Sequence, residues 1–224
     1  MRRLALLLGA AGVAHAGPPL NTDDAGVLPA GACQLELRVR GGPHPQQQYA
    51  QPSCNPGGSI EWALNLAHAA PADAPVQTLL GLQGKTPLAA GDGYGATFSA
   101  AVVQELRRGV PATTGFATLI GSIMPTSAVA VHLNLGLSQV RGRHAVANWG
   151  AALELAVGDA WTLLGERYGE RHGRPATQIG ARTWLRPNVL QLDATLGREH
   201  VAGSGVRYAT LGLVWVWPDT WRSH

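Results

Sequence analysis

The stretch VANWGAALELAVGDAWTLLGERY, which runs from Val146 to Tyr168, decides the fold that this sequence predicts. From Trp149 to Leu155, apolar side chains occupy every second position, and smaller or polar ones lie between them. Successive side chains of a β-strand point to opposite faces, so this arm has an oily face and a polar face. Val157–Ala160 holds the Gly and Asp that tight turns favour, and a second alternating arm begins at Trp161. Each arm has roughly the ten residues that a tilted strand needs to cross a bilayer, which predicts one hairpin of a transmembrane β-barrel.

The same alternation continues along the chain and predicts an all-β fold, a transmembrane antiparallel up-and-down β-barrel. About twelve segments fit the pattern, and bacterial outer-membrane barrels have even strand numbers. The least regular segment contains Pro52, which cannot donate a hydrogen bond to a neighbouring strand. The predicted strands are Cys33–Arg40, Gln48–Asn55, Ser59–His68, Val76–Thr86, Gly95–Val103, Gly115–Met124, Ala128–Ser138, Val146–Ala156, Trp161–Tyr168, Ala176–Leu185, Asn188–Gly197 and Tyr208–Trp217.

The connections between these strands alternate in length, as they do in outer-membrane barrels with short periplasmic turns and longer outer loops. If the N-terminus is periplasmic, the periplasmic turns are short, and only Leu88–Tyr94 is longer. The predicted outer loops are Gly41–Gln47, Ala69–Pro75, Gln104–Thr114, Gln139–His144, Gly169–Pro175 and Arg198–Arg207.

Aromatic residues fall near both predicted membrane interfaces, which indicates the two aromatic girdles of a membrane barrel. The periplasmic girdle is predicted to contain Trp161, Trp184, Trp215 and Trp217. The outer girdle is predicted to contain Tyr49, Phe116, Trp149, Tyr168 and Tyr208.

Residues 1–16 have the features of a secretory signal peptide: a basic start, an apolar run too short to span a membrane, and the cleavage motif Ala14-His15-Ala16. Residues 17–32 are rich in Pro, Gly and Asp and predict a periplasmic lead-in or a segment folded into the barrel mouth. Residues 33–217 form the predicted barrel, and 218–224 a short tail. We therefore expect the exported protein in the bacterial outer membrane, assembled by the barrel-assembly machinery.

The charge balance argues against a nucleic-acid partner. Without Arg2 and Arg3, the formal net charge falls from +3 to +1, and no helix concentrates the arginines. Charged residues make up 14% of the chain, below the usual quarter or so. Together with 29 glycines and 7 tryptophans, this composition is typical of half-apolar barrel strands.

The two cysteines, Cys33 and Cys54, predict a disulfide, because an exported chain folds in an oxidising compartment. Two cysteines are too few for a zinc site, and no motif in the sequence cradles a phosphate or binds a metal. We therefore expect no cofactor.

The inner parity of the predicted strands collects ionisable and polar residues, because charges that face the lumen avoid the cost of facing lipid. They either pair and fill the interior or line a polar path for transport. Glu166 and Arg182, on neighbouring strands, are the first pair expected to touch. Asp23 and Asp24 either cap turns in the lead-in or plug the lumen by pairing with its arginines. The candidate lumen residues are Glu36, Arg38, Glu61, Lys85, His132, Asn134, Glu154, Glu166, Arg182 and Asp193.

Several short blocks resemble the outer-membrane proteins grouped as the MetA-pathway of phenol degradation family. The lead-in Pro19–Gly26 followed by Leu35-Glu36-Leu37 carries the resemblance, and later blocks agree with it, among them Gly165–Glu170 and Gln178–Arg182. The similarity covers most of the mature chain, although the cysteine pair, the short first hairpin and the tail depart from it. The resemblance implies an outer-membrane barrel with a transport role.

The leading functional interpretation is a passive channel or transporter for small molecules, including hydrophobic or aromatic ones, and not an enzyme. One alternative is a structural outer-membrane protein whose lumen is sealed by salt bridges. The other, a barrel-embedded hydrolase, rests on His132, Asn134 and Ser138, which share one parity but lack the geometry that defines a triad.

Arginines gather in or beside the predicted outer loops. Since the guanidinium group binds phosphate through two parallel hydrogen bonds, they predict a rim that binds lipopolysaccharide phosphates, with an ordinary solvated loop as the alternative. Outer-membrane lipids and lipopolysaccharide are therefore the expected partners. The arginines are Arg107, Arg108, Arg141, Arg143, Arg171, Arg174, Arg198 and Arg207.

Overall fold

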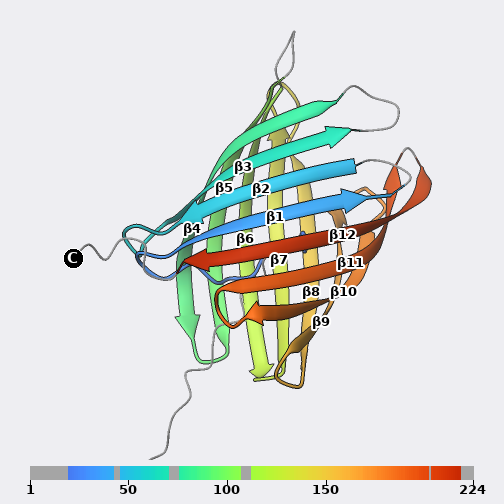
Figure 1. The fold of residues 1–224 in the computed structure, drawn as a ribbon. Helices are drawn as coiled ribbons and strands as arrows, with labels where there is room; N and C mark the ends of the chain where they lie inside the picture. The colour runs from blue at the N-terminus through green and yellow to red at the C-terminus, as the bar shows by residue number, and fades with distance from the viewer. Residues whose placement is uncertain (1–19, 43–45, 71–75, 107–111, 202, 218–224) are drawn as a thin grey trace, which may run out of the picture.

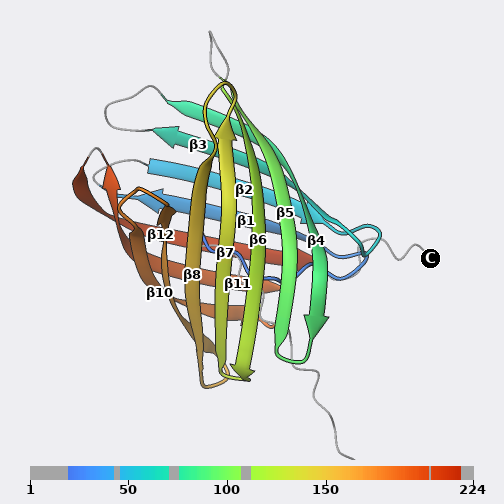
Figure 2. The same ribbon diagram turned by 180° about the vertical axis from the view of Figure 1, so that it is seen from behind.

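The protein is described by a computed structural model that covers residues 20–42, 46–70, 76–106, 112–201 and 203–217. The described residues form twelve β-strands that close into one barrel (Figures 1 and 2). Among them, no helix is long and apolar enough to cross a membrane. The strands are β1 (Cys33–Gly41), β2 (Gln46–Cys54), β3 (Glu61–Ala70), β4 (Gln77–Gly91), β5 (Tyr94–Glu105), β6 (Thr113–Thr126), β7 (Val129–Val140), β8 (Val146–Val157), β9 (Trp161–Glu170), β10 (Ala176–Arg186), β11 (Leu190–Val201) and β12 (Ser204–Trp217).

Every strand pairs antiparallel with its neighbours in sequence, and β1 pairs with β12 to close the barrel. The closing register runs from Cys33 opposite Trp217 to Gly41 opposite Ala209. The predicted fold class, an antiparallel up-and-down barrel of twelve strands, is therefore confirmed. Closure leaves no unpaired sheet edge, which is the condition for a β-sheet to lie in lipid.

The two faces of the wall differ as the alternation predicts. In β8 and β9, Leu153, Leu155 and Leu163 point outward and are exposed, whereas Glu154 and Glu166 are buried inside. Large exposed hydrophobic side chains cover the outside of the other strands in the same way. In water such a surface would be unfavourable, but it suits contact with lipid.

Two predicted connections are wrong because the strands continue through them. Residues Leu88–Tyr94 are not a long turn: β4 extends to Gly91, and Asp92 and Gly93 alone connect it to β5. The strand continues past Pro87, which is accommodated at a register shift between Pro87 and Ala89. Most of Arg198–Arg207 is likewise strand, because β11 and β12 pair as far as Val201 and Ser204.

The predicted outer aromatic girdle is wrong for its tyrosines. Tyr208 is buried in the lumen, where its hydroxyl lies 3.2 Å from that of Tyr168. Tyr49 also faces inward and donates to Asn65 at 2.6 Å. These residues lie at the expected depth but on the polar parity of their strands, and the parity decides the face. Near the other end, Trp161 and Trp215 are exposed on the outside as expected. Trp184 was also predicted in that girdle, but it shares the inward parity of Arg182 and lines the interior cavity.

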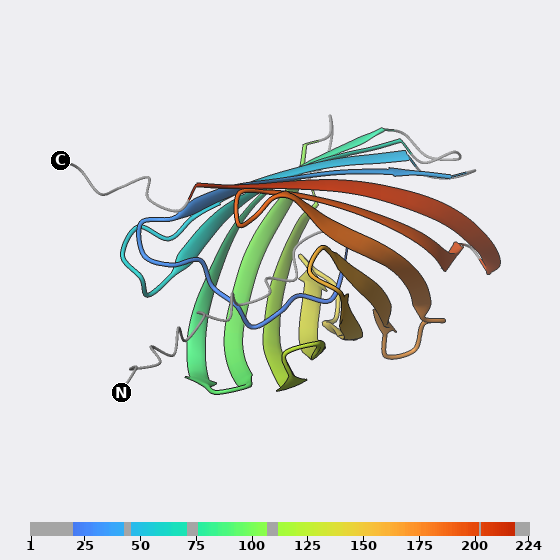
Figure 3. The ribbon, with the colours of Figure 1, turned by 60° about the horizontal axis from the view of Figure 1, so that its bottom comes forward.

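Residues 20–32, called here the inner segment, run through the interior of the barrel before β1 begins (Figure 3). Leu20, Thr22, Asp24, Leu28 and Ala32 of this segment are buried. Of the two arrangements that the sequence left open, the structure has the one in which this stretch folds into the barrel.

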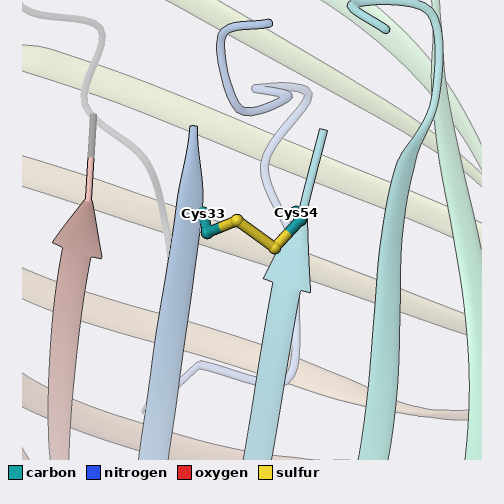
Figure 4. The surroundings of a disulfide bond; sticks show 2 residues. All are labelled: Cys33 and Cys54. Atoms are coloured by element: carbon teal, nitrogen blue, oxygen red, sulfur yellow. A yellow bond between two sulfur atoms is a disulfide. The ribbon is translucent and has the colours of Figure 1, made fainter. Parts of the chain in front are cut away.

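The predicted disulfide is present and joins the start of β1 to the end of β2 (Figure 4). Cys33 and Cys54 lie directly opposite each other in the register of these strands. The bond therefore fixes the first hairpin at the point where the inner segment leaves the lumen.

The predicted signal peptide 1–16, the tail 218–224, and Arg107 and Arg108 lie outside the described residues. Those expectations stay predictions.

Candidate functional site

The carboxylate of Glu166 on β9 holds the start of the inner segment. Its oxygens accept hydrogen bonds from the backbone nitrogen of Asn21 at 2.8 and 3.0 Å, and from that of Thr22 at 2.7 Å. Asn21 Nδ2 donates to the same carboxylate at 3.0 Å, as does Gln178 Nε2 at 2.6 Å. Hydrogen bonds to an ionised, buried acceptor are roughly twice as strong as neutral ones. Glu166 is therefore a principal anchor of the segment.

Close packing accompanies this anchor. An added Cβ on Gly150 of β8 would lie 2.5 Å from Thr22 Oγ1 and 3.3 Å from Thr22 Cβ. A larger residue at position 150 would press on the side chain of Thr22, so glycine permits the close approach of the two chains.

The middle of the segment binds the opposite wall through both charge and backbone. Lys85 Nζ of β4 lies 3.0 Å from Asp23 Oδ1, and Asn134 Nδ2 of β7 donates to the Asp23 carbonyl oxygen at 3.1 Å. The nitrogen of Ala25 donates to Ser122 Oγ at 2.8 Å. Burial raises the pKa of Asp23 to about 6, and the ammonium group of Lys85 opposes that shift.

The exit of the segment is fixed by Glu61 and Asn55. Glu61 Oε2 of β3 accepts a hydrogen bond from the nitrogen of Leu28 at 2.8 Å. Asn55 Nδ2 donates to the Leu28 carbonyl oxygen at 2.6 Å, and the backbone of Asn55 bonds to Gly31 and Ala32. The inner segment is thus attached to several strands of the wall along its whole length.

A cavity of about 490 Å³ remains beside the inner segment, between it and the wall formed by β1–β4 and β10–β12. Acidic side chains outnumber basic ones in its lining, because Asp23, Asp24, Glu36 and Glu61 face only Arg38 and Lys85. The remaining lining combines carboxamides with an apolar wall that includes Trp184, Val214 and Val216.

A second cluster of charges lies on the other side of the interior. Arg182 Nη1 of β10 donates to both oxygens of Glu154 on β8, at 3.0 and 3.1 Å. His132 Nε2 lies 3.7 Å from Glu154, and its Nδ1 lies 2.8 Å from Ser122 Oγ. All four side chains are buried. None of them lines the cavity, so this cluster fills the interior.

Nine of the ten predicted lumen residues are buried in the barrel, and Arg38 is half-buried. Arg38 stacks over the ring of Tyr49, 4.9 Å from its centre. The predicted contact between Glu166 and Arg182 is wrong. The register places Gln178 opposite Glu166, and Arg182 binds Glu154 instead. The role of these residues in transport stays a prediction.

Both interpretations of the aspartate pair hold in part. Asp23 does bind a lumen cation, but the cation is Lys85 and not an arginine. Asp24 Oδ1 accepts a hydrogen bond from the nitrogen of Gly26, which caps a turn inside the lumen.

Sequence reasoning missed the contacts made by Asn21, Thr22 and Ser122. An irregular segment has no periodic sequence pattern, so the sequence does not show which residues of the wall it contacts. The clue that was present is the excess of inward acids: Glu61 and Glu166 both accept hydrogen bonds from backbone nitrogens of the segment.

The residues considered for a hydrolase do not come together as a triad. Asn134 binds the inner segment, and His132 faces Ser122 rather than Ser138. Ser122, His132 and Glu154 do follow one another at 2.8 and 3.7 Å, yet each is at most 6% exposed and none lines the cavity. Within the part of the chain that the structure describes, no group of three or more His, Cys, Asp or Glu side chains is placed to hold a metal.

Solved outer-membrane channels share this architecture. The KdgM porin in complex with disordered oligogalacturonate has a TM-score of 0.66 and 8% identity, over 81% of this chain and 98% of that one. The COG4313 outer membrane channel from Pseudomonas putida F1 has a TM-score of 0.61 and 11% identity, over 88% and 100% of the two chains. The NanC porin has a TM-score of 0.57 and 9% identity, over 82% and 98%. At such identities the likeness shows the fold alone, which matches bacterial outer-membrane barrels.

The family comparison rests on sequence. No curated protein matches the chain. One family model, described as "Uncharacterised conserved protein UCP029691", matches residues 4–216, which include the inner segment and all of the barrel except Trp217. The chain therefore belongs to the family of uncharacterised conserved proteins UCP029691.

Proposed function

We propose that this protein is a narrow outer-membrane channel for small molecules, and that solutes pass through the cavity beside the inner segment. The observation that carries the proposal is that the inner segment narrows the lumen without filling it, since about 490 Å³ remains beside it. A twelve-strand barrel lies between the solid eight-stranded barrels and the open porins, so a segment of this size turns a wide lumen into a restricted path.

The lining suggests a class of solute. Acidic side chains outnumber basic ones in the lining, which favours cations over anions in the cavity. The apolar wall around Trp184 accommodates an apolar body. Small amphipathic cations therefore fit the path best. The resemblance to the MetA-pathway of phenol degradation family supports a transport role for small, including aromatic, molecules, and the fold shared with solved channels agrees with it.

A second candidate is a structural protein with a sealed lumen. The buried Glu154–Arg182 pair favours it, because these paired charges occupy part of the interior away from the cavity. In that case the cavity beside the inner segment does not continue through the barrel.

Conductance in planar lipid bilayers separates these functions. The experiment compares the native protein, Glu166→Ala, which loosens the start of the inner segment, and Glu199→Gln as a control. Glu199 pairs with Arg40 and does not bind the inner segment. We expect small cation-selective currents from the native protein and the control, and larger, less selective currents from Glu166→Ala. Silence of the native protein together with conduction by Glu166→Ala would support the sealed interpretation.

A further inference from the structure

The outer wall of the barrel carries a groove that the channel does not use. The groove has a volume of about 780 Å³ and lies over β4–β7, the strands nearest the viewer in Figure 2. Its floor consists of small residues that pair across neighbouring strands: Gly84 with Ala100, and Ala100 with Ala117. Gly115 lies beside them, and an added Cβ there would meet no atom within 4 Å.

Larger side chains enclose this floor. Trp62 pairs with Gly84 at one side, and Leu137 pairs with Ala117 at the other. In the row closer to the β4–β5 turn, Phe98, Leu119 and Leu135 are all large and exposed. The wall thus has a depression in a surface that is otherwise covered by bulky apolar side chains, and this surface faces lipid.

The groove ends at a cation. At the β7–β8 connection, Arg141 lines its mouth and is exposed. No carboxylate of a described residue forms an ion pair with Arg141. The connection lies at the barrel end opposite the Cys33–Cys54 disulfide, where the sequence predicts the outer loops.

We propose that this groove binds lipopolysaccharide, with one acyl chain along the floor and a phosphate of the lipid A moiety on Arg141. An acyl chain in the groove packs more closely against the protein than lipid tails pack against a smooth wall. Because no water is displaced inside the membrane, this closer van der Waals packing is the force that favours binding. The guanidinium group binds phosphate in a bidentate manner. Arg141 lies at the mouth of the groove, so the acyl chain and the phosphate of one lipid A molecule bind at the same time. This inference rests on the placement in the outer membrane and is independent of conduction.

Native mass spectrometry with purified diphosphoryl lipid A tests the proposal on the detergent-solubilised full chain. Two variants attack the site: Gly115→Leu fills the groove, and Arg141→Ser removes the charge. Each has a matched control away from the groove. Gly165→Leu adds the same bulk at a lipid-facing glycine of β9 that also has open space, and Arg143→Ser removes an exposed arginine of the same connection that does not line the groove.

We expect both site variants to weaken lipid A binding by roughly tenfold, the effect of losing one good interaction, while both controls bind as the native protein does. Dephosphorylated lipid A should bind native protein and Arg141→Ser equally. Equal binding of diphosphoryl lipid A by all five proteins would overturn the proposal, as would a preference of the native protein for phosphatidylglycerol over lipid A. Heat-modifiable migration on gels verifies that every variant is folded.

Discussion

The buried carboxylates of the lumen each accept hydrogen bonds from a different donor. Glu166 and Glu61 accept backbone nitrogens of the inner segment, whereas Glu154 accepts the guanidinium group of Arg182. Partner choice follows from the depth of each residue along its strand, which the alternation of the sequence alone does not give. The side of the wall to which each side chain points was therefore predictable, but the hydrogen-bonded and ion pairs were not.

The Glu154–Arg182 pair should be strongly coupled in stability. Removal of one partner breaks a buried ion pair, at a cost of about 3 kcal/mol or more. We expect Glu154→Gln and Arg182→Gln each to lower the free energy of unfolding by this amount, and the double variant by much less than the sum. Urea titration in lipid vesicles measures it. The exposed control Arg207→Gln should stay within about 0.5 kcal/mol of the native protein; strict additivity of the pair would refute the coupling.

Asp23 should make stability depend on pH. Its pKa of about 6 in the folded protein lies above the ordinary value of 3.8, so the folded state binds the proton more tightly than the unfolded state does. This contribution is fully present below pH 4 and is lost as the pH rises through 6. Relative to Asp23→Asn, the native protein should therefore lose thermal stability between pH 4 and pH 7. Parallel melting curves of the two proteins across that range would contradict the shifted pKa.

At the scale of elements, hairpins with clear alternation were predicted to within a few residues, and the errors lie at strand ends and in the face assigned to the aromatic residues. β8 and β9 match the predicted arms closely. The predicted strand Val76–Thr86 in fact continues past a register shift at Pro87 to the Asp92-Gly93 turn. The tyrosines lie at the depth of a girdle, but they occupy the inward parity of their strands. Alternation thus locates the strands well, but it does not give the point at which a long strand ends.

The disulfide should stabilise the first hairpin and, with it, the exit of the inner segment. Cys33 and Cys54 are separated by 21 residues, and closing a loop of that length in the unfolded chain contributes about 3 kcal/mol. The variant with both cysteines replaced by serine should therefore unfold at lower urea concentration than the native protein. Reduced native protein serves as the control and should behave like the variant. An unchanged midpoint would show that strand pairing alone holds this hairpin.

At the scale of the whole molecule, the barrel was predictable because twelve strands repeat the same two-residue alternation. The inner segment has no such periodic pattern. Its path depends on contacts with residues far away in sequence, such as those of Asn21 with Glu166 and of Ala25 with Ser122. The composition of residues 17–32 predicted a periplasmic lead-in or a segment folded into the barrel mouth, but none of its contacts. The candidate path for solutes is defined by where this segment lies, so the shape of the site was not predictable from the sequence.

The position of the inner segment is the central claim, and a cross-link between Thr22→Cys and Gly150→Cys tests it most directly. A Cβ at position 150 lies 3.3 Å from Thr22 Cβ, close to the separation of about 3.5–4.5 Å that a disulfide spans. Mild oxidation of folded protein in outer-membrane vesicles, followed by gel electrophoresis without reductant and thiol labelling, should show near-complete formation of this bond. Free thiols at both positions in a protein that is folded and heat-modifiable would contradict the claim that the segment lies inside the barrel.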